Sequence, residues 1–172
     1  VAGIKLSSTR VSCAVTDMQA KVRSSIALPI TISRRPAEFV AEIVGDAVRH
    51  CDFEAGIQVS DLFGVGVGVP GFVDSASGCC YWTPLYTKGG IPLKKLLEKK
   101  LGTRVFVEND SNSLALARLW SPESVGESNF LVVSVEDGIG LGIVIDGNLY
   151  RGVRGIGSEF GHVVIVPGGE LC

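Results

Sequence analysis

The sequence lacks the features of several specialised protein classes. No run approaches the roughly 18 consecutive apolar residues of a membrane span, so no membrane partner is expected. The opening VAGIKL has no basic segment before its apolar residues, and it predicts a strand instead of a signal peptide. The formal net charge is only −2, so bulk charge does not indicate nucleic-acid binding.

Cysteine is scarce, and its number is odd. The spacing of the five cysteines indicates no disulfide framework. A reducing, cytoplasmic setting is therefore expected. The cysteines are Cys13, Cys51, Cys79, Cys80 and Cys172.

Glycine, by contrast, is abundant, with 22 residues. The glycines gather at 64–71, 138–142 and 152–169, where they punctuate β-rich stretches. The hydrophobic content of 46% suffices for one sizeable core or two small ones. Because Val1 is not an initiator methionine and Cys172 follows a turn-like segment, we expect the sequence to be a piece of a longer protein.

The pattern of apolar residues predicts strands and helices in a definite order. Three β-like runs are followed by alternating helices and strands, and then by further strands separated by glycine turns. Strands are predicted at 1–6, 11–16, 21–32, 62–69, 104–107, 130–135, 142–145, 149–152 and 162–166, and helices at 36–50, 92–101 and 109–120. This order predicts an α/β fold with a mixed sheet. We expect one unit over residues 1–127 and the truncated start of a second over 128–172.

Glu108-Asn109-Asp110 lies between a predicted strand and a predicted helix, where α/β sheets present ligands. Asn109 offers both a donor and an acceptor, and Asp110 accepts two hydrogen bonds, which suits vicinal sugar hydroxyls. The alternative interpretation is that Asn109 or Asp110 only caps the helix.

A second polar group lies in the glycine-rich segment 155–162. Glu159 and His162 are three residues apart, so they can converge on one point in a turn or helix. A glycine turn that carries a surface glutamate and an incidental histidine is the alternative. His162 and Cys172 are both zinc-ligand types, but two ligands do not complete a structural zinc site.

Two further glycine segments are better explained as turns. Glu136-Asp137-Gly138 begins a glycine loop, but two carboxylates would repel an anionic ligand, so a β-hairpin turn is favoured over a phosphate loop. The segment 66–71 ends a buried strand, and simple turn chemistry accounts for it.

Three blocks together resemble the ROK (repressor, open reading frame, kinase) family. They are Gly68-Val69-Pro70-Gly71, VFVENDSNSLALA at 105–117, and GIGLGIVIDGNLYRGVRGIGSEFGHVVIVPGGELC at 138–172. The resemblance extends from the first strand to the last residue. It implies an actin-like ATPase (ribonuclease-H-like) fold, with one complete half, the beginning of the second, and sugar bound between the halves.

The resemblance also assigns roles to individual residues. Asn109 and Asp110 match the pair that hydrogen-bonds the sugar, and in kinases of the family the aspartate is the general base. Glu159 and His162 match further sugar contacts. Gly71, and less closely Thr83, match positions near the sugar. His162 and Cys172 match zinc ligands, in a site whose other two cysteines would lie beyond the sequence.

The phosphate-binding segments depart from the kinase pattern. Family kinases have Asp-x-Gly-Gly-Thr where this chain has the segment 5–9, with Lys5, Ser7 and Ser8 in place of the aspartate and both glycines. A second loop, Gly-Thr-Gly in kinases, reads Glu136-Asp137-Gly138 here. Phosphoryl transfer needs backbone access to the phosphates and a group that places magnesium, so these changes disfavour ATP and magnesium as cofactors.

The favoured hypothesis is therefore a kinase-inactive, sugar-sensing domain of a transcriptional repressor. Such regulators of the family act on DNA through an N-terminal helix-turn-helix domain, which this sequence does not include, and we expect a homodimer. The alternatives are an ATP-dependent sugar kinase that uses Asp110 as its base, and an interaction scaffold that binds neither sugar nor nucleotide.

Overall fold

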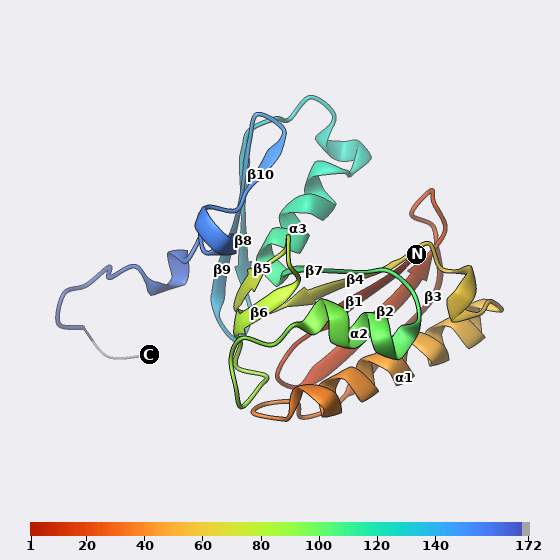
Figure 1. The fold of residues 1–172 in the computed structure, drawn as a ribbon. Coiled ribbons are helices and arrows are strands. Elements are labelled where there is room, and N and C mark those ends of the chain that lie inside the picture. Colours follow the sequence, from red (N-terminus) through yellow and green to blue (C-terminus); the bar gives the residue numbers. More distant parts are fainter. Residues whose placement is uncertain (170–172) are drawn as a thin grey trace.

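The computed structural model describes residues 1–169, and its largest sheet has five strands in the order β3-β2-β1-β4-β7 (Figure 1). The sheet is mixed. β1 pairs antiparallel with β2 and parallel with β4, while β2–β3 is antiparallel and β4–β7 parallel. The strands are β1 (Ala2–Leu6), β2 (Arg10–Thr16), β3 (Val22–Pro29), β4 (Val65–Val69) and β7 (Val105–Asn109). The mixed α/β prediction is confirmed.

Two helices, α1 (Ala37–Ala55) and α2 (Leu93–Leu101), cover one face of this sheet. The helical row Val40, Val44 and Val48 is fully buried against it. Burying such side chains supplies about 1.5–3 kcal/mol each, which fixes α1 on this face. Helix α1 runs five residues beyond its predicted end and stops at Gly56, which takes the left-handed conformation of a helix C-cap.

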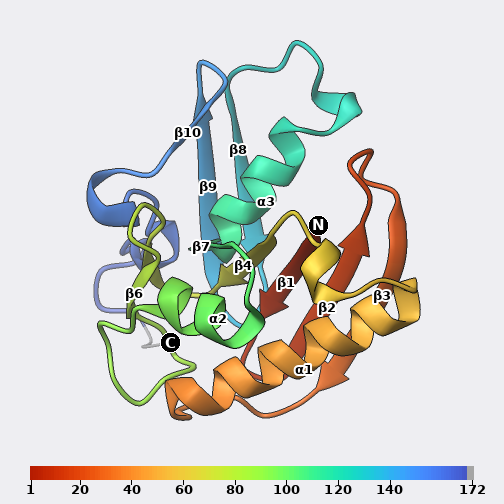
Figure 2. The same ribbon diagram turned by 45° about the vertical axis from the view of Figure 1, so that its right-hand side comes forward.

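Helix α3 (Asp110–Leu119) lies on the opposite face, between the large sheet and a second, three-stranded sheet (Figure 2). That sheet has the order β10-β9-β8, from β8 (Phe130–Val135), β9 (Ile139–Ile145) and β10 (Asn148–Tyr150). Gly140 and Gly142 of β9 face the helix. A Cβ on Gly142 would lie 2.6 Å from that of Ala115. These glycines therefore allow α3 to pack directly on β9.

Two parts of the strand prediction were wrong. In the chain, the hairpin of β5 (Phe72–Asp74) and β6 (Cys79–Trp82) follows β4 and precedes α2, in a segment where no strand was expected. The predicted strand at 162–166 does not form. This segment begins in a 3-10 turn (Phe160–His162), and its valines and isoleucine have no partner strand among residues 1–169. β-propensity needs cross-strand neighbours to be realised.

No helix within residues 1–169 combines the length and apolarity that a membrane crossing requires.

Candidate functional site

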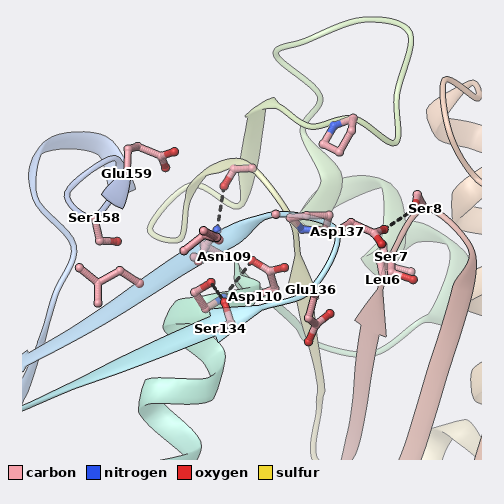
Figure 3. A pocket seen from close by; sticks show the side chains of 18 of the residues that line it. Leu6, Ser7, Ser8, Asn109, Asp110, Ser134, Glu136, Asp137, Ser158 and Glu159 are labelled. Atoms are coloured by element: carbon pink, nitrogen blue, oxygen red, sulfur yellow. Dashed lines mark hydrogen bonds between the residues drawn. The ribbon is translucent and has the colours of Figure 1, made fainter. Parts of the chain in front are cut away.

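A cleft of about 500 Å³ opens where β1, β4 and β7 end and the β8–β9 turn approaches them (Figure 3). The carboxyl ends of parallel strands are the usual ligand-binding edge of an α/β sheet. Residues from distant parts of the chain line it: Leu6, Ser7, Ser8, Pro70, Gly71, Trp82, Pro84, Asn109, Asp110, Ser111, Ser134, Glu136, Asp137, Gly138, Ile139, Gly140, Leu141, Ser158, Glu159 and His162. All five residues predicted to contact the sugar are among them.

Asn109 both caps α3 and braces the cleft. Its Oδ1 accepts a hydrogen bond from the Asn112 backbone N–H at 3.0 Å, so the capping interpretation is confirmed. Its Nδ2 donates to the Gly71 carbonyl oxygen at 3.0 Å. The cap thus fixes the Asn109 side chain at the cleft surface and ties it to the end of β4.

Asp110 follows directly, in the first turn of α3, and is half-buried. Its Oδ1 accepts from the Ser111 N–H at 2.9 Å, and the residue lines the cleft. Burial raises the pKa of the Asp110 carboxyl, and the nearby Glu136 carboxylate adds to this, while the Ser111 N–H and the Lys5 ammonium oppose it. The pKa of this carboxyl is thus above its ordinary value.

Gly71 occupies a backbone conformation that a side chain would strain, with φ of 112°. A Cβ there would lie 2.2 Å from the Trp82 carbonyl oxygen. The turn interpretation is therefore confirmed, and it also brings the backbone to the cleft. Thr83, by contrast, is buried outside the lining, and its hydroxyl accepts from the Leu85 N–H at 3.3 Å.

Glu159 and His162 reach the same cleft from the segment after β10. The Nε2 atom of His162 lies 3.9 Å from a carboxylate oxygen of Glu159, and both side chains are exposed at the cleft. Figure 3 shows Ser158 and Glu159 on the opposite side of Asn109 and Asp110 from Ser7 and Ser8. We call the lining by Gly71, Asn109, Asp110, Glu159 and His162 the Asn109 side of the cleft.

The predicted zinc site was an incomplete one, formed by His162 and Cys172, and the described part of the chain contains only the first of these ligands. Residues 1–169 contain no group of three or more histidine, cysteine, aspartate or glutamate side chains placed to hold a metal ion. Cys172 lies outside the described residues. His162 and Glu159 alone do not supply the four ligands of a structural zinc site, so no step is assigned to zinc.

The opposite lining, which we call the Ser8 side, consists of Ser7, Ser8, Glu136 and Asp137, and Lys5 lies next to it on β1. Ser8 Oγ donates to Asp137 Oδ2 at 2.6 Å, and the Lys5 ammonium pairs with the Glu136 carboxylate. These two contacts tie β1 and the loop after it to the β8–β9 turn. The turn is a tight hairpin, closed by a hydrogen bond from the Glu136 N–H to the Gly138 carbonyl oxygen at 2.9 Å, as predicted.

Two further contacts link the second sheet and the segment after it to β7 and α3, and motif reasoning did not assign them. Arg151 Nε donates to Glu108 Oε2 at 2.7 Å, and the hydroxyls of Ser111 and Ser134 lie 2.8 Å apart. Glu108 stands beside the Asn109-Asp110 pair in the sequence, but nothing local predicts that Arg151 is its partner, because the two are 43 residues apart.

Comparison with known proteins decides the family. The sequence model of the family described as "ROK family" matches residues 1–172. This chain belongs to the ROK family. The predicted membership is thereby confirmed, and residues from each of the three sequence blocks line the cleft.

ROK structures share the fold of this chain. A ROK glucokinase from Streptomyces griseus, solved with glucose and AMPPNP, superposes with a TM-score of 0.86 at 29% identity, covering 99% of this chain and 52% of its own. A ROK transcriptional regulator, described as a homolog of E. coli MLC protein, gives 0.85 at 25% identity, covering 99% of this chain and 43% of its own. The ROK actin-like ATPase fold is thus confirmed over about half of the length of those proteins.

Named ROK relatives include both enzymes and repressors. A glucokinase of Halalkalibacterium halodurans is 39% identical over 114 residues, which are 66% of this chain and 34% of that protein. A xylose repressor of Bacillus subtilis is 32% identical over 135 residues, which are 78% of this chain and 35% of that protein. The chain therefore spans from about a third to a half of its relatives, which belong to both functional types.

Proposed function

We propose that this chain is the sugar-binding core of a ROK transcriptional regulator, which senses a sugar effector without phosphorylating it. The observation that carries the proposal is the difference between the two sides of one cleft. The Asn109 side keeps the amide, carboxylate and imidazole groups that suit sugar hydroxyls. The Ser8 side carries carboxylates where kinases of the family bind phosphates.

Electrostatics oppose a triphosphate on the Ser8 side. Glu136 and Asp137 project from the turn that would face the β- and γ-phosphates, and the nearby cation Lys5 is already paired with Glu136. Like charges at about 4 Å repel by ~1 kcal/mol in bulk water and more in a partly enclosed cleft. The Ser7 and Ser8 side chains also replace the two glycines through which family kinases give the phosphates access to the backbone.

In this proposal, sugar binding shifts the arrangement of the parts that meet at the cleft. The sugar changes that equilibrium only by its difference in affinity for the two arrangements. Through a DNA-binding domain outside this chain, and in a homodimer, the shift would alter operator affinity. The named xylose repressors and the MLC homolog support this role.

Calorimetry of the full-length protein against D-glucose and D-xylose tests the proposal, alongside a coupled assay of ATP consumption. We expect one of the two sugars to bind and no sugar-dependent ATP turnover. Asp110→Asn should weaken the sugar affinity by about tenfold or more, because it removes a charged acceptor. Asp46→Asn on the distant helix α1 is the control. A folded protein that binds neither sugar contradicts the proposal.

The second candidate function is an ATP-dependent sugar kinase with Asp110 as general base. It is favoured by the raised pKa of Asp110 within the cleft and by the glucokinases among the relatives. Sugar-dependent turnover that Asp110→Asn abolishes would establish the kinase and reject the sensor.

A further inference from the structure

The Glu108 carboxylate is nearly enclosed, with a side chain only 11% exposed, and donors reach it from two directions. On its own side, Oε1 accepts from the Asn109 N–H at 3.0 Å and from Asn112 Nδ2 at 3.1 Å. From the segment after β10, Arg151 Nε donates to Oε2 at 2.7 Å. A buried carboxylate needs such partners, because an unpaired one would carry a large desolvation cost.

Arg151 is in turn joined to the segment that carries Glu159. The Arg151 carbonyl oxygen accepts from the Gly157 N–H at 3.1 Å. The backbone segments on the two sides of this loop lie very close together. A Cβ on Gly157 would lie 2.8 Å from the Arg151 carbonyl carbon, and a Cβ on Gly152 would lie 2.5 Å from the Gly157 Cα. A movement of Arg151 is therefore passed to Gly157 and to Ser158 and Glu159, which follow it.

We infer that Glu108 and Arg151 are a positioning pair, which sets the distance between the two groups of ligand contacts on the Asn109 side of the cleft. Glu108 holds the start of α3, and with it Asn109 and Asp110, while Arg151 holds the loop that bears Glu159 and His162. Neither Glu108 nor Arg151 lines the cleft, so both act through other residues. The inference rests on the proposed sugar-binding function for its effect on affinity, but the geometry of the pair is independent of it.

Binding of D-glucose and D-xylose to the full-length protein tests the consequence for affinity. Arg151→Met should weaken binding of the recognised sugar by about tenfold. Arg151→Lys should weaken the binding less, because lysine keeps the charge but not the planar donor geometry. Glu108→Gln combined with Arg151→Met should cost no more than Arg151→Met alone, since both changes break one contact. Arg49→Met, which removes an exposed ion pair on α1, is the matched control.

Hydrogen exchange without sugar tests the pair itself. Arg151→Met should speed exchange of the amides at 155–160, while those of α1 keep their wild-type rates and Arg49→Met changes neither. A purely structural role would instead speed exchange throughout the molecule.

The outcomes separate the two claims. Faster exchange at 155–160 in a protein that binds neither sugar supports the pair and rejects the proposed function. Wild-type affinity in Arg151→Met, or unchanged exchange at 155–160, overturns the inference.

Discussion

Lys5 near the end of β1 and Glu136 in the β8–β9 turn form an ion pair, although they are 131 residues apart in the chain. Each replaces a residue of a kinase phosphate-binding segment, and each carries the charge that the other needs. The two departures are therefore complementary in the folded protein. The Lys5 ammonium is paired with the Glu136 carboxylate, and this pairing competes with any contact between Lys5 and a phosphate.

We expect the Lys5–Glu136 pair to be a weak, salt-sensitive contact. Its side chains are 40% and 48% exposed, so solvent screens it, and the coupling should be only about 0.5 kcal/mol. Urea unfolding of Lys5→Ala, Glu136→Ala and the double variant measures it. The coupling should shrink at high salt; a large value that salt leaves unchanged would contradict this view of the cleft.

Restoring the kinase pattern should restore nucleotide binding. We expect the natural chain to show no binding of AMPPNP with magnesium, and the combination of K5D, S7G, S8G, E136G and D137T to bind it measurably. The reason is the removal of both the acidic turn and the side chains that cover the backbone. Calorimetry compares the two proteins, with K5D alone as the partial control. Equal, strong binding by the natural chain would contradict the electrostatic argument.

Close packing of α3 on β9 predicts the effect of two glycine substitutions. Gly142→Ala should destabilise the protein by about 1–3 kcal/mol, because the added Cβ would lie 2.7 Å from the Ser111 carbonyl oxygen. Gly138→Ala is the matched control, since nothing lies within 4 Å of a Cβ there. Denaturant unfolding measures both. Equal stability of the two variants would show that α3 does not rest on β9 in this way.

Asp52 on α1 predicts a pH-dependent stability. Asp52 is only 1% exposed, and among residues 1–169 neither of its carboxylate oxygens has a hydrogen-bond partner; burial raises the pKa of this carboxyl to about 6. The folded state therefore favours the protonated acid. This contribution is fully present below the unfolded-state pKa of about 4, and it is lost as the pH rises through about 6.

We therefore expect the free energy of unfolding of Asp52→Asn, relative to that of the natural chain, to be higher at about pH 7.5 than at about pH 4.5. The expected increase in this difference is roughly 2 kcal/mol. Urea unfolding at both pH values gives the difference, and Asp46→Asn on the exposed side of the same helix should show little of it. A difference that is the same at both pH values would mean that Asp52 is not buried as a lone acid.

Local sequence determined most of the helices and strands. The row of Val40, Val44 and Val48 predicted α1 because helical spacing alone places those residues on one face. The β5–β6 hairpin was missed, although Asp74 offers a signal. Its carboxylate accepts from the Ala76 N–H and from the Ser77 hydroxyl, which is typical of a turn that begins with aspartate.

The sequence also determined which residues form the candidate site, because each family block brings its own polar groups. Asn109 and Asp110 follow a buried strand, and Glu159 and His162 share one short glycine-rich segment. Their spacing alone did not show that these two groups line the same cleft as Ser8 and Asp137.

Only the tertiary structure decided the pairings. Lys5 with Glu136 and Arg151 with Glu108 join residues far apart in the chain, and no periodicity or short motif encodes such contacts. They arise because β1 and β7 end at the same edge of one sheet, and because α3 holds the second sheet against that edge. The strand predicted at 162–166 did not form for the same reason: a strand depends on a neighbour that lies elsewhere in the chain.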